Sequence, residues 1–355
     1  MFAGNQFDSR LYQVRPSQGN LIYSPFSISA LLHLIAAGAR GQTLDDLRSV
    51  LGLSGDVPVL DWHDSPQIKM ANALFVNNAV DLLEEYRQYV EACRGEIFHR
   101  DMISCQEIND WASQHTNGMI DRVLDGDMGV MALVLINAIW FKDRWEHEFN
   151  PQFTTAKPFR TGCIADYAAP VLVPMMWQQH RFQYVNLGFA QMIRLKYRGP
   201  ISMYVVLPKD DVVDCMAGWE VDFWMSEMKY REVILSLPKF TFESSLDLGG
   251  AFKQLGLGDL FDRATADLSG ICRNVPLWVD FVTHKAKIQV AETGTEAAAV
   301  TTMGFSGCAP RDVVPVVFEA NHPFVFAIKH DDIPTPLFVG RIVNPAGMDD
   351  PLTTR

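Results

Sequence analysis

We predict an α+β fold for this chain of 355 residues from three observations. Residues 133–141, LVLINAIWF, are almost continuously apolar, which indicates a strand covered on both faces. Residues 24–38 begin with helix-capping side chains and continue with apolar residues at helical spacing. Residues 292–302 carry small side chains at a period of two, which is the period of a strand.

The first part of the chain predicts helices. Residues 6–14 form the first one, which ends before a proline. Ser24 or Ser27 can cap the next helix, and Gly38 ends it. The buried stripe of that helix consists of Ile28, Leu31, Leu32 and Ile35. Thr43 begins a further short helix.

Strands and helices alternate irregularly in the remainder. Helices are expected at residues 81–93, around Ile108 and Trp111, and at 246–255. Strands are expected at residues 67–76, 191–197, 201–207, 233–242, 277–290 and from 315 onward. Asn137 lies inside the apolar strand 133–141 and must therefore find hydrogen-bond partners.

The stretch of residues 292–311, ETGTEAAAVTTMGFSGCAPR, is the feature around which we expect the chain to be organised. In a strand, the four small residues Thr295, Ala297, Ala299 and Thr301 share one face. The charged Glu296 lies on the opposite face. The residues that follow are rich in glycine and include a proline, a composition typical of an exposed, flexible tip.

Several motifs in this order resemble the serpin family of protease inhibitors. The reactive-loop hinge of that family resembles the residues Glu292, Gly294, Thr295, Glu296, Ala297, Ala298 and Ala299. Further matches are N-L-I-Y-S-P-F-S-I-S at 20–29, I-N-x-W at 108–111, V-P-M-M at 173–176, N-H-P-F at 321–324 and L-F-V-G-R at 337–341. The resemblance runs from about residue 5 to residue 345.

The resemblance implies a serpin fold, with three β-sheets surrounded by about nine helices and an exposed reactive-centre loop at residues 292–315. It implies a single domain at residues 1–345, and the polar composition of residues 346–355 predicts a flexible tail. The family keeps a polar cluster where the main sheet parts to admit the loop. Here the matching residues are Ser24, Ser27, Asn137 and His284, with Trp145 at the top of the opening.

The function that the resemblance implies is suicide inhibition of a serine protease. The protease attacks the loop, forms an acyl-enzyme and is trapped when the cleaved loop inserts into the main sheet. The alternatives are a non-inhibitory serpin that acts as a carrier, chaperone or storage protein, and an inhibitor of a cysteine protease. Non-inhibitory members usually carry charged or bulky hinge residues, whereas the hinge side chains of this sequence are mostly small. Thr293 departs from the family pattern, which usually has a charged residue at this position.

Family spacing places the scissile bond after the seventeenth residue counted from Glu292, which is the bond Cys308–Ala309. A protonated cysteine is apolar and modest in size, which suits an elastase-like or chymotrypsin-like protease. Phe305 is an alternative for a chymotrypsin-like enzyme. Arg311 is an alternative for a trypsin-like enzyme.

Composition and motifs restrict the other classes of function. The formal net charge of −12 disfavours nucleic acid, heparin and acidic membranes as partners, and we expect a monomer whose partner is a protease. The sequence lacks H-E-x-x-H, G-x-S-x-G and a P-loop, so we expect no catalytic residue, no metal site and no cofactor.

The expected location follows from the cysteines and the start of the chain. Six scattered cysteines include no C-x-x-C pair, and no N-x-S/T sequon occurs. The sequence resembles the intracellular, ovalbumin-like serpins, which lack a signal peptide. We therefore expect a cytoplasmic protein, or a secreted one whose signal is not recognisable in this sequence.

Overall fold

The computed structural model describes residues 4–14, 19–60, 67–126, 129–161, 169–209, 221–295 and 314–347. Its contacts divide the chain into two compact units, each assembled from separate stretches of sequence. Unit 1 consists of residues 1–15, 23–141 and 243–287, and unit 2 of residues 16–22, 142–242 and 288–355. Among the described helices, none is long and apolar enough to cross a membrane.

Unit 1 is built on a sheet whose central strand is β4 (Leu133–Phe141). All nine residues of β4 are buried, as its apolar sequence predicted. Strand β2 (Ile68–Asn77) pairs with it in antiparallel orientation, and β12 (Phe281–Ala291) pairs with it in parallel orientation. The outer strands are β3 (Glu96–Arg100) beside β2 and β11 (Phe240–Asp247) beside β12.

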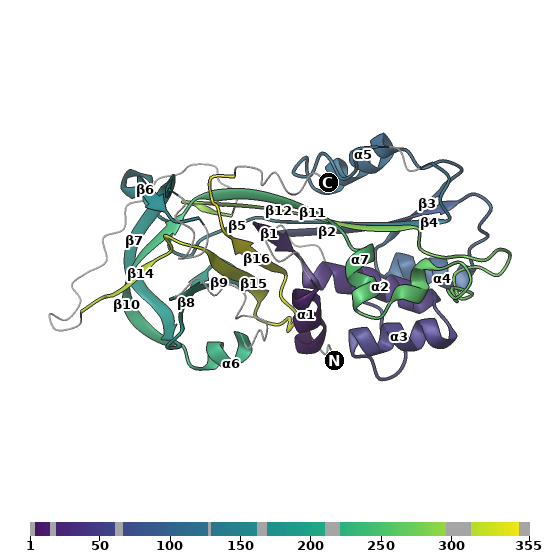
Figure 1. The fold of residues 1–355 in the computed structure, drawn as a ribbon, viewed down its shortest axis with the longest axis horizontal. Helices are drawn as coiled ribbons and strands as arrows, with labels where there is room; N and C mark the ends of the chain where they lie inside the picture. The colour runs from purple at the N-terminus through teal and green to yellow at the C-terminus, as the bar shows by residue number, and fades with distance from the viewer. Residues whose placement is uncertain are drawn as a thin grey trace. The chain divides into compact units, whose positions relative to one another are not determined.

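Helices cover both faces of this sheet (Figure 1). Helix α5 (Cys105–His115) lies on one face, and α2 (Pro25–Gly38) lies on the other. The remaining helices of the unit are α1 (Gly4–Gln13), α3 (Gly41–Leu51), α4 (Glu84–Ala92), α7 (Gly249–Gln254) and the short 3-10 helix η3 (Gly258–Phe261).

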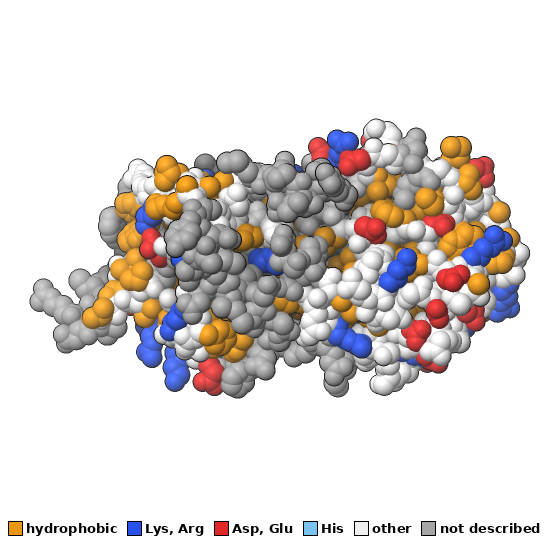
Figure 2. All heavy atoms as spheres, in the orientation of Figure 1, with side chains coloured by type: hydrophobic (Ala, Val, Ile, Leu, Met, Phe, Trp, Pro, Cys, Tyr) orange, Lys and Arg blue, Asp and Glu red, His pale blue; other side chains and the backbone are white. Residues whose placement is uncertain are grey.

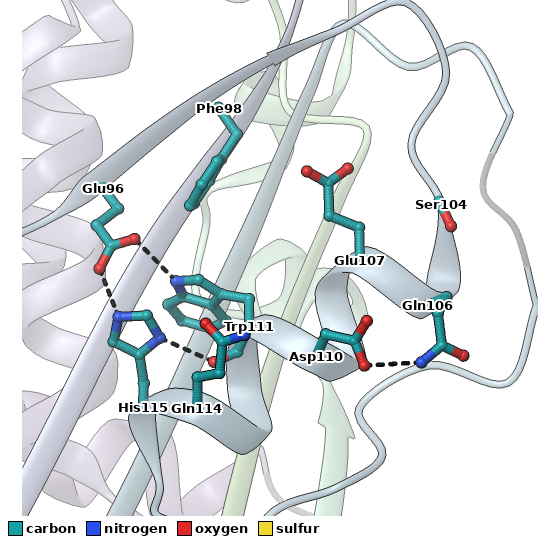
Figure 3. A pocket seen from close by; sticks show the side chains of 9 residues that line it. All are labelled: Glu96, Phe98, Ser104, Gln106, Glu107, Asp110, Trp111, Gln114 and His115. Carbon is teal, nitrogen blue, oxygen red and sulfur yellow. Dashed lines mark hydrogen bonds and ion pairs between the residues drawn. The ribbon is translucent and has the colours of Figure 1, made fainter.

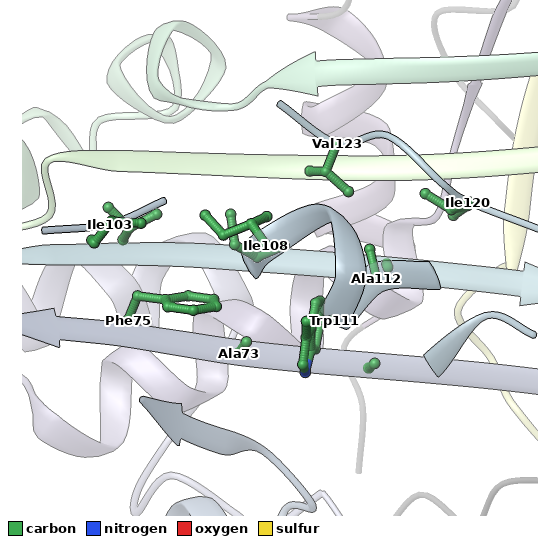
Figure 4. Packing of buried hydrophobic residues seen from close by; sticks show 12 residues of the cluster. Ala73, Phe75, Ile103, Ile108, Trp111, Ala112, Ile120 and Val123 are labelled. Carbon is green, nitrogen blue, oxygen red and sulfur yellow. The ribbon is translucent and has the colours of Figure 1, made fainter. Parts of the chain in front are cut away.

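The core beneath α5 explains why this helix forms where it does (Figure 4). Ile108 and Trp111 point from one side of α5 onto the sheet, as their spacing predicted. The sheet residues that receive them are Ala71, Ala73, Phe75, Val134, Ile136 and Ala138. In β2 and β4 these residues alternate with side chains that face α2, because successive strand residues point to opposite faces.

Helix α2 differs from the sequence-based expectation of a one-sided stripe. Ser24 caps it, because its side chain accepts a hydrogen bond from the backbone N–H of Ser27 at 3.0 Å. All its residues except Ala37 are buried, so the helix passes through the core instead of lying on it. Helix α3 begins at Gly41, not at Thr43, whose hydroxyl instead accepts a hydrogen bond from the backbone of Asp267.

Unit 2 contains the larger sheet, in the strand order β1-β16-β15-β9-β8-β7-β10-β14, with β6 also beside β7. The strands are β1 (Leu21–Tyr23), β6 (Thr155–Phe159), β7 (Val171–Asn186), β8 (Ala190–Lys196), β9 (Ile201–Pro208), β10 (Lys229–Pro238), β14 (Val316–Glu319), β15 (Phe324–His330) and β16 (Phe338–Ile342). The short strands β5 (Asp143–Arg144) and β13 (Gly294–Thr295), helix α6 (Val221–Ser226) and the 3-10 helix η1 (Pro151–Phe153) complete the unit.

Three features of the strands differ from the predicted pattern. The expected strand 233–242 is divided at Lys239 into β10 and β11, which belong to different sheets. The strand expected from residue 315 is two strands, β14 and β15. The described strands form two hydrogen-bonded sheets instead of the expected three, because the 16-residue β7 pairs with β6 and β10 and, at its end, also with β8.

Candidate functional site

The predicted loop hinge begins as a tight hairpin at the end of β12. Glu292 and Thr293 form the turn, and β13 then returns beside β12, with Thr295 opposite Val290. On its other side β13 pairs with β5, with Thr295 opposite Asp143. The first hinge residues therefore already form a buried strand between two others, whereas the sequence predicted an exposed loop from residue 292 whose strand enters the sheet only after cleavage.

Gly294 is required by this arrangement. Its φ of +153° is rarely adopted by residues with a side chain. A Cβ atom at this position would lie 2.1 Å from the backbone oxygen of Asp143. The close approach of β13 to β5 therefore depends on glycine.

Thr295 is fully buried, and its hydroxyl lies 2.8 Å from the hydroxyl of Tyr197. Burial raises the pKa of Tyr197 well above its ordinary value, so its hydroxyl is protonated and able to donate. The Tyr197 ring stacks on Trp145, with ring centroids 4.3 Å apart. The indole N–H of Trp145 donates to the backbone oxygen of Ala291 at 2.9 Å, which ties the ring to the end of β12.

Glu292 anchors the turn of the hairpin. Its carboxylate forms an ion pair with Lys239 at 2.7 Å and accepts a hydrogen bond from Thr154 Oγ1 at 2.8 Å. Burial alone would raise the pKa of Glu292, but the bonds from Lys239 and Thr154 outweigh it and lower that pKa. The backbone N–H groups of Trp145 and Phe149 donate to the carbonyls of Thr293 and Glu292 at 3.0 and 2.9 Å.

Four of the predicted polar residues meet in the core of unit 1, together with Asn72. The ring of His284 accepts a hydrogen bond at Nε2 from the backbone N–H of Ser24 at 3.0 Å. Its Nδ1 lies 2.5 Å from Asn137 Oδ1, which also accepts from Ser27 Oγ at 2.8 Å. Asn137 Nδ2 donates to Asn72 Oδ1 at 2.7 Å. The predicted partners of Asn137 are therefore present.

This geometry determines the state of His284. Because Nε2 accepts from an N–H group, the ring proton must be on Nδ1, where it is donated to Asn137. The ring is fully buried, and desolvation lowers the pKa of His284 to about 3. His284 is therefore neutral at physiological pH.

The structure places Trp145 with Tyr197, Phe149 and Ala291, and its described contacts include none of the four polar residues. The other predicted site residues, Glu296, Ala297, Ala298, Ala299, Phe305, Cys308, Ala309 and Arg311, lie outside the described residues. Sequence reasoning missed Tyr197, Lys239, Thr154 and Asn72. Lys239 was visible in the sequence only as part of a strand, because nothing local links it to Glu292.

Apart from the hinge and the polar cluster, a pocket lies between β3 and α5 (Figure 3). This pocket of about 520 Å³ is lined by polar and aromatic side chains, among them Glu96, Glu107, Trp111 and His115. Its carboxylates have partners within the protein, since Glu96 accepts from Trp111 and His115, Glu107 binds Arg100, and Asp110 accepts from Gln106. The pocket therefore does not present unpaired carboxylates to a ligand at these positions.

Two further observations limit the chemistry of the described residues. They contain no group of three or more His, Cys, Asp or Glu side chains placed to hold a metal ion. On the face of the molecule in Figure 2, the described acidic and basic side chains are interspersed instead of being collected by sign.

A sequence model of one family, the serpins (serine protease inhibitors), matches residues 3–345. The chain belongs to the serpin family. The serpin-like protein TK1782 of Thermococcus kodakarensis is 33% identical, over 96% of this chain and 84% of that protein. Mouse leukocyte elastase inhibitor A is 31% identical, over 92% of this chain and 93% of that protein.

Solved serpin structures have the same fold as this one. Human thyroxine-binding globulin, solved with its hormone bound, superposes with a TM-score of 0.85 at 25% identity, over 96% of this serpin and 97% of that chain. The family membership places the chain among protease inhibitors and not among enzymes. The family description and the relatives named as protease inhibitors support a protease as the class of partner.

Proposed function

We propose that this serpin inhibits a serine protease as a suicide substrate. The serine oxygen of the protease attacks the carbonyl carbon of the scissile bond, and the amine of the following residue leaves. The new ester is then trapped because the freed loop continues β13 into the space between β4 and β12. The observation that carries this proposal is that Gly294 and Thr295 already form a strand between β12 and β5, the short strand that follows β4 in the chain.

The inward position of Thr295 supports insertion. Its side chain is fully buried against Tyr197, so the inner face at this depth accepts a small polar residue. The inward residues that follow at a period of two, Ala297, Ala299 and Thr301, are also small. Burying them requires neither a charge nor a large side chain to be accommodated.

Insertion must separate β4 from β12, and this gives the polar cluster a role. His284 and Asn137 are register partners across these two strands, and they share a hydrogen bond. We propose that this cluster keeps the sheet closed until the loop is cut. The energy that insertion releases must exceed the loss of these buried hydrogen bonds.

The proposed bond is Cys308–Ala309, and the proposed target is an elastase-like or chymotrypsin-like protease. The relationship to mouse leukocyte elastase inhibitor A favours an elastase. Phe305 and Arg311 are the alternative positions, and a cysteine protease is the alternative class. We also propose a cytoplasmic location and a monomeric state; the buried thiol of Cys272 is compatible with a reducing compartment.

The second candidate function is a non-inhibitory carrier. The observation that favours it is the structural similarity to thyroxine-binding globulin, whose name says that it binds thyroxine. A carrier requires no loop insertion, so the two functions differ in what happens after the loop is cut.

Incubation with elastase, chymotrypsin, trypsin and papain tests both functions. Inhibition predicts a covalent complex that survives a denaturing gel. It also predicts a released C-terminal peptide whose mass shows that its first residue is Ala309. A peptide that begins at Ser306 or Asp312 would move the bond to Phe305 or Arg311. Proteases blocked at the active-site nucleophile are the control and should form no complex. Cleavage of the loop with full recovery of protease activity would support the carrier instead.

A further inference from the structure

Two histidines stack on one another next to the hinge. His147 follows β5, and His180 lies on β7, with ring centroids 3.7 Å apart and planes inclined by 30°. Phe182 packs its edge against the second ring, at 5.8 Å. At this separation the rings attract as neutral aromatic groups and repel when both carry a proton.

The backbone on either side of His147 holds the hinge in place. The N–H groups of Trp145 and Phe149, two residues before and after it, donate to the carbonyls of Thr293 and Glu292. The carbonyl of His147 itself accepts from Gln178 Nε2 at 3.4 Å, which ties the segment to β7. His147 therefore lies in the middle of the segment whose backbone fastens the hairpin.

The charged groups around the pair do not neutralise a second proton. Glu146 favours protonation of His147, but partial desolvation of this exposed ring and the charge of His180 have larger effects and lower the pKa of His147. Arg181 and Glu232 neighbour His180 on β7 and β10, and strand alternation directs both to the opposite face. Glu148 is occupied by Arg144 and Arg198, at 2.9 and 2.8 Å.

We infer that the His147–His180 stack is a pH-sensitive clamp on the loop hinge. At neutral pH the stack is intact, and the 145–149 segment fastens the hairpin of β12 and β13. When the pH falls below the ordinary range of histidine, the second proton drives the rings apart and the fastening loosens. In the proposed function, the hinge is the part of the loop that must enter the sheet. Loosening it with acid would therefore regulate inhibition, and this regulatory role rests on the proposed function.

Hydrogen exchange of the backbone amides at residues 288–295 tests the clamp, after correction for the intrinsic pH dependence of exchange. In the natural protein, protection should be present at pH 7.5 and lost at pH 5.5. His180→Gln removes the second charge, so protection should persist at both pH values. If this variant does not fold, His147→Gln makes the same test from the other ring.

The matched control is His99→Gln, at a partly exposed histidine on β3 whose pKa is also lowered by burial. It should lose hinge protection with acid as the natural protein does. Equal protection at both pH values in the natural protein, or the same acid loss in His180→Gln, would overturn the clamp. Because hydrogen exchange involves no protease, a failure to trap any protease would remove the proposed function without deciding this result.

Discussion

At the scale of single residues, the hinge is defined by what each position can accommodate. Gly294 touches the backbone of β5, and Thr295 fills a buried site beside Tyr197. Glu292 is buried only because Lys239 and Thr154 compensate its charge. The side chain at each position is therefore restricted for a different reason: close backbone approach at Gly294, burial at Thr295 and charge compensation at Glu292.

Gly294→Ala should weaken the hairpin. The new Cβ would meet the backbone of Asp143, and overpacking of this kind costs about 1–3 kcal/mol. We expect a lower midpoint of urea unfolding and faster hydrogen exchange at residues 290–295. Gly250→Ala in α7 is the matched control, because a Cβ there meets no atom within 4 Å. It should leave stability unchanged or raise it by up to about 1 kcal/mol. Equal effects of the two substitutions would contradict the close approach of β13 and β5.

Thr295→Arg should turn the inhibitor into a substrate. Thr295 is already fully buried in β13, so an unpaired guanidinium at this position would force the start of the loop out of the sheet, and insertion would have to bury the charge again at a cost of several kcal/mol. The acyl-enzyme should then hydrolyse before the loop inserts, so the number of inhibitor molecules consumed per protease rises. Glu296→Arg places the same charge on the predicted solvent face and should leave that number nearly unchanged. If Glu296→Arg is the more harmful change, the inward and outward assignments are wrong.

At the scale of elements, the polar cluster joins the N-terminus of α2 to the paired strands β4 and β12. Three separate parts of the sequence contribute to one set of hydrogen bonds: Ser24 and Ser27 from the start of α2, Asn137 from β4, and His284 from β12. Because these groups lie in the core, an unsatisfied member would be costly. The cluster therefore ties the paired strands β4 and β12 to the start of α2.

The neutral state of His284 predicts acid destabilisation. The folded-state pKa of about 3 lies below the ordinary value of 6.5, so between these values the unfolded chain binds a proton that the native chain does not. The free energy of unfolding should be fully maintained above pH 6.5. Between pH 6.5 and 3 it should fall by at most about 1.4 kcal/mol per pH unit from this residue.

The measurement is the urea midpoint between pH 4 and 8. His284→Asn should have a lower midpoint at neutral pH and a shallower dependence on pH than the natural protein. His330→Gln, at a histidine of β15 with an exposed partner in Asp332, should retain the original slope. An unchanged slope in His284→Asn would show that His284 titrates normally.

At the scale of the whole molecule, the proposed mechanism requires a native state that is not the most stable one. In that mechanism, the parallel pair β4 and β12 is the point at which another strand is added. Each net backbone hydrogen bond contributes on the order of 1 kcal/mol. A strand of about ten residues would therefore add stability comparable to that of an ordinary domain.

Cleavage of the loop should raise the unfolding temperature. A single cut between residues 303 and 311 frees the hinge to complete the sheet, whereas a cut in an ordinary loop leaves stability equal or lower. Calorimetry of the intact and the singly cut protein measures the difference, with mass spectrometry to confirm one cut. A synthetic peptide of the hinge sequence, added before cleavage, should abolish the rise by occupying the same position. An unchanged melting temperature after the cut would favour the carrier function.

Much of this fold could be predicted because its strongest signals are local. The apolar run of β4, the capped helix α2 and the spacing of Ile108 and Trp111 each indicate their element within a few residues. The family motifs then placed Ser24, Ser27, Asn137 and His284 in one cluster, and the structure brings these four together. The inward assignment of Thr295 combined the period of a strand with the small residues on its face and the charge of Glu296 on the other.

Only the tertiary structure decided the partners that lie far apart in sequence. Tyr197 meets Thr295 and Lys239 meets Glu292, and in neither case does a local pattern indicate the contact. The division at Lys239 into β10 and β11 was also hidden, because both halves have the composition of a strand. The sequence by itself determined the family, through its motifs, and the main elements, since periodicity and capping act over a few residues. The tertiary structure decided how the hinge is held, since burial and pairing depend on which distant strands meet.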